Sequence, residues 1–499
     1  MVGFRLAATE QFNLVAITDS FPLQYDTSYG QLAGFLQPFP AGFDPTNMSY
    51  LRMKGALDIP RTHVQEALIR AYVEYVHPFL PILDLGNLFT ILGDQSGSNG
   101  RISLLLYQAI LSAGSSFVDC KCLYEEGFQS RREARKFFLR NTKMLYDFDY
   151  ESDRLILVQS ILLMTYWYDH PDDQQDSWYW IGIAVSLAHT IGLHSYRRYL
   201  GLAPAEQHRW KRIWWACYMR DCLISLGTKK PRRIGDEDFD IPMLQEHDFE
   251  IGTVSLVGSS LTYGQFEVLQ NTHLQRDLAV MCILKARLCV ILGRILGTQY
   301  TLSIGQAGVA EGAGRVPYMK RRSEMTTILN EASIELGAWT YSLPDSCRYR
   351  TVTHLDMRGS GAILALHRAL LGMLCCTVTS ILYRFGRASL LSQPLPGTLT
   401  ALVTCRTRVR EAVTQTIQMG RELQRHGLIR FLPSTSITIF LITTTLYVLE
   451  GNKSEVGVYG EDGFDGLQTC KEIVEELCET HVAGEAGSEW FNLILRRAG

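Results

Sequence analysis

Apolar residues recur at three- and four-residue intervals along most of this chain, which is the spacing of one face of an α-helix. From Thr62 onward, Val64, Leu68 and Tyr72 keep that spacing until Pro78 ends the helix. The same criterion predicts helices over about 101–118, 129–146, 153–169, 176–192, 206–226, 274–297, 319–341, 357–385, 400–426, 431–450, 465–480 and 487–497. Alternation with a period of two is nearly absent, so the pattern predicts an all-α protein.

Changes in this pattern divide the chain into four parts. Residues 1–58 are rich in Phe, Pro and Gly and show weak periodicity, so we expect an extended lead-in segment. Residues 59–298 and 318–499 carry the helical pattern, and the glycine-rich stretch 299–317 between them is typical of a linker. We therefore predict a large multi-helix body of two packed helical lobes. Within it, His77 to Asp84 should form a rigid extended corner because it holds two prolines.

Composition supports a folded body and limits its partners. Hydrophobic residues make up 46% of the 499, enough for a large core, and the net charge of −3 argues against a body that binds polyanions. The first of the 12 cysteines is Cys120, and they are too scattered for a metal cluster. With no signal-like N-terminus, we expect an intracellular protein. The apolar run Gly361 to Tyr383 contains His367 and Arg368, which favours a buried helix over a membrane span.

One acidic motif suggests chemistry. Asp172-Asp173-Gln174-Gln175-Asp176 matches the DDxxD pattern, in which carboxylates bridge magnesium ions that bind a diphosphate. This leaves open a metal-dependent all-α enzyme of terpenoid type. His170-Pro171 places the motif on a loop and no second metal motif follows, so we favour exposed residues that cap the next helix. His189 and His194 lie on different helix faces, and no HExxH, Gly-x-Ser-x-Gly or phosphate-binding loop occurs. We thus expect no catalytic residue, cofactor or metal ligand.

The segment 206–242 is the most distinctive part of the chain. Trp210, Trp214, Cys217 and Asp221 share one face of the predicted helix 206–226, so we expect Asp221 to be a buried structural carboxylate with an arginine or several donors as partners. Arg220 is turned about 100° from it, and we expect its substitution to be tolerated better.

The loop after this helix carries four cations, Lys229, Lys230, Arg232 and Arg233. They suggest a nuclear import signal or a phosphate contact. We favour a loop that is neutralised by the acidic residues 236–240, which follow at once.

This segment, in its order of aromatic helix, basic loop and acidic exit, resembles the middle homology region of fungal zinc-cluster transcription factors, in the cutinase transcription factor-like branch. Further blocks in the family's order extend the resemblance over about residues 50–245: Tyr50–Leu57, Tyr72–Asp84, Gln159–Tyr168, Trp178–Ala184 and Ala188–His194. The C-terminal half is similar in composition only.

The resemblance implies a nuclear transcription regulator, with 59–298 as its regulatory domain and a metabolic or biosynthetic gene set as its target. It implies partners among other transcription factors or a second copy of the chain, a small-molecule effector and no membrane. The family's six zinc-binding cysteines match no position here. We therefore expect DNA contact to be indirect, unless a zinc-cluster exon is missing from this chain. A scaffold without a ligand remains a further alternative.

Overall fold

The structure, a computed structural model, describes residues 32–94, 96–167, 175–253, 266–297, 322–354, 356–357, 359–391, 398–451 and 461–481. Helices make up most of these ranges, and the β-type pairing in them is a single isolated bridge between Leu36 and Ile102. The prediction of an all-α protein is confirmed.

The first helices cover the segment up to residue 164. They are α1 (Pro45–Met53), α2 (Thr62–Ala71), the π-helix η1 (Tyr72–Val76), α3 (Leu85–Gly93), α4 (Leu104–Gly114), α5 (Cys120–Glu125), α6 (Arg131–Asp147) and α7 (Arg154–Met164). The middle of the chain forms α8 (Ser177–Ile191), η2 (Tyr196–Gly201), α9 (Pro204–Thr228), η3 (Glu246–Asp248), α10 (Glu267–Gln270) and α11 (Thr272–Gly297). The last part forms α12 (Arg322–Tyr341), α13 (Gly361–Leu391), α14 (Thr398–Arg425), η5 (Ile429–Phe431), α15 (Thr435–Gly451) and α16 (Glu461–Thr480).

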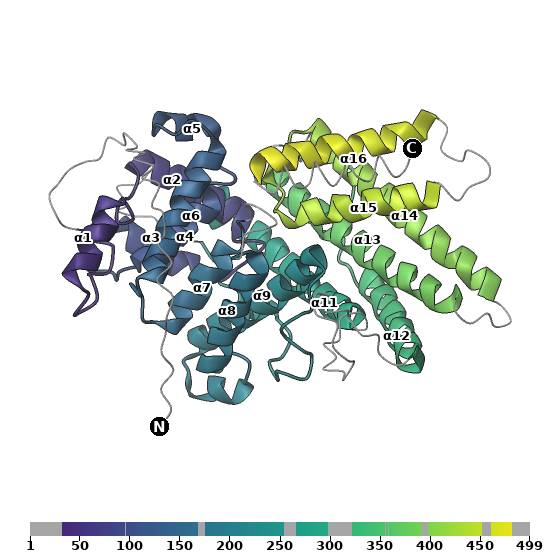
Figure 1. Ribbon diagram of the computed structural model, residues 1–499, viewed down its shortest axis with the longest axis horizontal. Helices are drawn as coiled ribbons and strands as arrows, with labels where there is room; N and C mark the ends of the chain where they lie inside the picture. Colours follow the sequence, from purple (N-terminus) through teal and green to yellow (C-terminus); the bar gives the residue numbers. More distant parts are fainter. Residues whose placement is uncertain are drawn as a thin grey trace, which may run out of the picture.

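Figure 1 shows α1–α8 at one end of the molecule and α12–α16 at the other, with α9 and α11 between them. One buried apolar cluster includes side chains from both ends, and α11 packs against α9, α12 and α13. The two predicted helical parts therefore share a continuous core. The predicted linker 299–317 and the predicted helix 487–497 lie outside the described residues.

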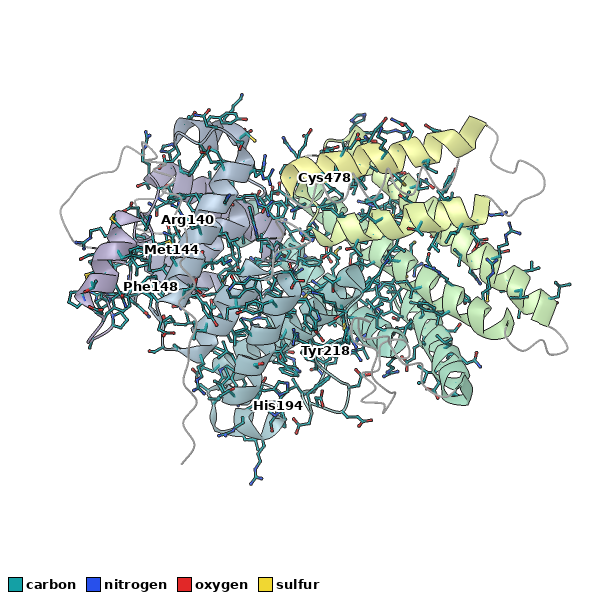
Figure 2. The ribbon with its side chains drawn as sticks, in the orientation of Figure 1. Arg140, Met144, Phe148, His194, Tyr218 and Cys478 are labelled. Atoms are coloured by element: carbon teal, nitrogen blue, oxygen red, sulfur yellow. The ribbon has the colours of Figure 1, made fainter. Side chains whose placement is uncertain are left out.

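One expectation about the first third of the chain needs correction, and two short helices there were not predicted. Residues 1–58 are not extended throughout, because α1 forms within them and buries Leu51. Figure 2 shows Arg140, Met144 and Phe148 in a row along α6, on its side toward α1. There Phe148 stacks on Tyr50 with ring centroids 5.4 Å apart. The short helices α3 and α5 were not predicted, because each spans fewer than three turns and shows too little periodicity.

α9 is the central helix of the first part. It begins at Pro204, whose missing N–H has no effect because the first N–H groups of a helix have no partner within the helix. Its C-cap Lys229 is left-handed with φ 55°. Every residue from Lys211 to Leu226 is buried, so the helix has no exposed face rather than the single apolar stripe we predicted. The buried charges of this stretch, Lys211, Arg212, Arg220 and Asp221, must therefore find partners inside the protein.

α13 is, within the described ranges, the one helix long and apolar enough to cross a membrane, but most of it is buried inside the protein. This burial agrees with a core helix, as expected from His367 and Arg368. All 12 cysteines are free thiols, and most of them are buried. Burial raises the pKa of several of them, such as Cys376 to about 12, which keeps them protonated and unreactive.

Candidate functional site

The predicted corner after α2 is held by side chains from four later helices. The π-helix η1 ends at Val76, and the corner begins as a turn rather than extended, because Phe79 and Leu80 donate backbone bonds to the carbonyl of Val76. Carbonyls of the corner and of η1 accept from long side chains: in the corner, Ile82 from Gln159 (2.6 Å), Pro81 from Arg212 Nε (3.0 Å) and Phe79 from Lys285 Nζ, and in η1, Glu74 from His367 Nε2 (3.3 Å). The corner is thus a junction between α7, α9, α11 and α13.

A cavity of about 400 Å³ opens beside this corner. Its walls come from the corner itself, the start of α3, residues 249–253, α10 and the first turns of α11. The lining is mainly apolar, with Leu85, Phe249, Leu278 and Ala279 among its members, and Arg212 and Glu250 add a charged pair. A concave, largely apolar site with a few placed polar groups is the usual form of a small-molecule site.

Arg212 is the polar centre of the cavity. The residue is 1% exposed, and its Nη2 lies 2.5 Å from Glu250 Oε1. Its Nη1 donates to the carbonyl of Asp248, which ties α9 to the wall segment. Glu250 is the accessible member of the pair, with a side chain 40% exposed. Burial raises the pKa of Glu250, and the guanidinium of Arg212 opposes that rise.

His77 forms part of the same wall. Burial, and secondly the charge of Arg212, lowers its pKa to about 3, so the imidazole is neutral at physiological pH. Its Nδ1 is buried and has no hydrogen-bond partner among the described residues. The cavity therefore combines a balanced ion pair with a neutral ring, which suits binding better than proton transfer.

The predicted buried carboxylate, Asp221, is 1% exposed. Its Oδ2 accepts from the backbone N–H groups of Ile234 (3.0 Å) and Arg233 (2.9 Å), so its closest partners are main-chain donors of the basic loop. Burial raises the pKa of Asp221 to about 6, and these backbone hydrogen bonds limit the rise. Arg212, an arginine of the same helix, binds the corner instead of Asp221.

Three of the four loop cations make contacts inside the protein. Lys230 Nζ lies 2.6 Å from Asp176, and Arg232 Nη1 lies 3.3 Å from Asp236. Arg233 lies over the ring of Trp178, 3.6 Å from its centroid. Lys229, at the left-handed end of α9, is exposed and makes none of these contacts, and Arg233 is exposed as well.

We expected Arg220 to tolerate substitution because it is turned away from the buried face of the helix. This reason is wrong, because Arg220 is itself buried. Arg220 is 2% exposed, with Nε donating to Thr165 Oγ1 (3.0 Å) and Nη2 to the carbonyl of Thr165 (2.7 Å). It also lies over the ring of Tyr166, 5.1 Å from the centroid. A helix buried on all sides leaves no solvent-facing position for it.

Of the DDxxD-like motif, Asp172 and Asp173 lie outside the described residues. Asp176 is the N-cap of α8, where its Oδ1 accepts from the backbone N–H of Tyr179 at 2.7 Å. His189 and His194 are neighbours rather than remote, with ring centroids 4.5 Å apart, because the left-handed Gly192 turns the chain back. Burial lowers the pKa of His189.

The fold also assembles a group that spacing along the sequence did not reveal. His208 of α9 meets His247 and Asp248 of η3, and their possible ligand atoms all lie within 4.8 Å of one another. Cysteine clusters and the HExxH motif can be recognised in a sequence because their ligands are close together along the chain. A pairing across about forty residues has no such signal.

Comparison with known proteins places the chain among fungal regulators. A family model described as the fungal specific transcription factor domain matches residues 69–331. The chain is 42% identical to cutinase transcription factor 1 beta of Fusarium vanettenii, over 95% of its own length and 54% of that protein's. It is 28% identical to the transcription factor cpaR of Aspergillus oryzae, over 89% of its length and 74% of that protein's. An acetamidase regulatory protein of Aspergillus fumigatus is 27% identical over 59% of the chain and 33% of its own length. The chain thus spans about half the length of the first of these relatives.

Proposed function

Because the chain belongs to the fungal specific transcription factor domain family, we propose that it regulates transcription in the nucleus through its helical body. Relatives named as transcription factors support this, and their names fit a protein without catalytic activity. The alternative of a terpenoid-type enzyme has less support, because Asp176 caps a helix and pairs with Lys230.

The target is proposed to be a metabolic or biosynthetic gene set. One relative is named for cutinase and another for acetamidase, so the names agree on metabolism and differ on the gene. The chain spans about half of the first relative, and we propose that its DNA contact is indirect, through a partner, unless a zinc-cluster exon is missing from this chain. Suitable partners are other transcription factors or a second copy of the chain.

For the basic loop we propose a structural role. Lys230, Arg232 and Arg233 contact Asp176, Asp236 and Trp178, which leaves Lys229 as the main candidate for an import receptor or a phosphate. These contacts support the proposal that the loop holds α8 against the residues that follow α9.

We further propose that the body responds to a small molecule bound in the corner cavity. The observation that carries this is the pairing of Arg212 with Glu250 in an otherwise largely apolar space of about 400 Å³. An effector with an apolar body and a carboxylate would take the position of the Glu250 carboxylate on Arg212. That exchange would release the Glu250 side chain from α9, while the bonds of Arg212 to the carbonyls of Pro81 and Asp248 stay in place.

A tethered reporter tests both parts. The chain is fused to a heterologous DNA-binding module in a fungal host, and we expect reporter output several-fold away from that of the module alone. Thr90→Phe places a ring at the cavity, where Thr90 forms part of the wall. The matched control is Thr404→Phe, since both threonines are exposed on helices and donate to the carbonyl four residues earlier.

We expect Thr90→Phe to change the output and Thr404→Phe to leave it unchanged. Equal outputs from the two variants would count against the effector cavity. An output equal to that of the module alone, from a folded nuclear fusion, would count against transcription regulation itself.

A further inference from the structure

The group formed by His208, His247 and Asp248 has the composition of a transition-metal site. Two imidazoles and one carboxylate are common ligands of zinc in three-residue sites that keep one position for water. His208 Nδ1 lies 3.0 Å from Asp248 Oδ1, and His247 Nε2 lies 3.8 Å from the same oxygen. Zinc bonds of about 2.0–2.1 Å in a tetrahedron place the ligand atoms roughly 3.3 Å apart. One of the two observed distances is shorter than this separation and the other is longer.

We propose that His208, His247 and Asp248 bind a divalent transition-metal ion of the zinc class, with solvent completing its coordination. The ion would replace the direct contact between His208 and Asp248. This revises our expectation that the chain has no metal ligands, which rested on sequence spacing alone. It does not depend on the effector cavity or on transcription regulation.

The surroundings hold Asp248 ready for this role. Asp248 is 1% exposed, and its Oδ2 accepts from Lys211 Nζ and from the backbone N–H of Gln245, each at 2.7 Å. These contacts fix the carboxylate and leave Oδ1 directed at the two imidazoles, as outer-shell partners do in metal sites. Lys211 also places a positive charge beside the site. We therefore expect an exchangeable ion rather than a permanently bound one.

Access to the site is open on one side. The side chain of His247 is 62% exposed and that of His208 is 33% exposed, so an ion reaches them from solvent. The two rings stand at 73° with centroids 5.3 Å apart. His247 belongs to η3 and His208 to α9, so an ion bound to both would cross-link these two elements.

Such a cross-link would act on the adjacent residues of the cavity wall. Arg212 lies one turn after His208 on α9, and it is bonded to the carbonyl of Asp248 and to the side chain of Glu250. An ion bound at Asp248 would therefore restrict the motion of residues 245–250. We expect their amide hydrogens to exchange more slowly when the ion is present.

The experiment uses the purified full chain after chelator treatment. It is dialysed against zinc and then measured for bound metal, and cobalt is used in parallel because its visible spectrum reports tetrahedral nitrogen and oxygen ligands. We expect one equivalent of zinc and a tetrahedral cobalt spectrum for the wild type. His247→Gln should lose both, and so should His208→Gln.

The matched control is His354→Gln. His354 and His426 form another surface imidazole pair, with ring centroids 5.9 Å apart. If zinc bound to any pair of surface histidines, His354→Gln would also lose bound zinc. We expect this variant to keep its full equivalent. Hydrogen exchange adds a second readout, in which zinc should slow residues 245–250 in the wild type and not in His247→Gln.

Each other outcome overturns the proposal. Zinc retained by both His208→Gln and His247→Gln would place the ion elsewhere, and a folded wild type that takes up no zinc would show that the three side chains form a hydrogen-bonded group only. His247 is largely exposed, so its variant should fold normally, and its thermal midpoint would check this.

Discussion

Asp221 allows the cost of a buried charge and the value of its hydrogen bonds to be measured separately. Asp221→Asn removes the charge but keeps one oxygen, and one oxygen is enough, since Oδ2 alone accepts from both Ile234 and Arg233. Asp221→Ala removes the charge and the acceptor together. Both variants lack the titrating group, so their stability difference should not depend on pH.

The two backbone donors set the difference between the variants. Stranding a buried N–H costs about 1–3 kcal/mol, and the N–H of Ile234 is buried while that of Arg233 is partly so. We therefore expect Asp221→Ala to be less stable than Asp221→Asn by about 2–5 kcal/mol at every pH. Denaturation by urea, followed through the fluorescence of the neighbouring Trp214 and Trp215, measures it.

The pH dependence separates wild type from Asp221→Asn. The folded pKa of Asp221, about 6, lies above the ordinary value of 3.8, so the native state binds a proton that the unfolded chain has lost. This difference in proton binding stabilises the native state fully below about pH 4. The stabilisation is lost as the pH rises through 6, which lowers the free energy of unfolding by about 3 kcal/mol. The wild type should therefore weaken relative to Asp221→Asn between pH 4 and pH 7. All other titrating groups are common to both chains, so parallel stability curves over that range would refute the reasoning.

Five further substitutions at four positions test the packing and a helix cap, each by the same urea denaturation. Arg220→Ala should cost about 2–3 kcal/mol, because it removes two hydrogen bonds from a buried guanidinium, and a loss below about 0.5 kcal/mol would mean that the side chain is exposed. Gly114→Ala should cost more than about 1 kcal/mol, because the new Cβ would lie 2.2 Å from the carbonyl of Leu68. Gly337→Ala, on α12 with open space around it, should instead gain up to about 1 kcal/mol, and a similar loss at both glycines would contradict the close approach. Asp176→Ala should cost about 1 kcal/mol through the lost helix cap while Asp176→Asn costs less, and equal losses would show that the ion pair, not the cap, matters there.

Sequence periodicity identified the long helices because each of them repeats its apolar spacing over several turns. It located α8 and α11 within a few residues of their ends, and it indicated the corner through Pro78 and Pro81. It could not indicate α3 or α5, which are too short to establish a period. Nor could it indicate the π-helix η1, whose residues would suit an α-helix equally well.

The candidate sites were less accessible to sequence reasoning than the helices. Asp221 was noticed because a carboxylate on an aromatic face must find partners, and its closest partners are backbone N–H groups, the second of the two alternatives expected for it. The cavity draws its walls from the corner, α3, α10 and α11, and no local pattern links these segments. The orientation of Arg212 toward the corner depends in the same way on how the helices pack, which a pattern along one helix does not contain.

The corner between η1 and α3 also constrains the order in which the protein can be completed during synthesis. The side chains that bind its carbonyls occur 77, 131, 206 and 293 residues later in the chain. At about 5–20 residues per second, a ribosome would add the last of them, His367, roughly 15–60 s after the corner. A nascent chain that ends near residue 298 would still lack that donor for the carbonyl of Glu74. That carbonyl would then remain bound to water until α13 emerges.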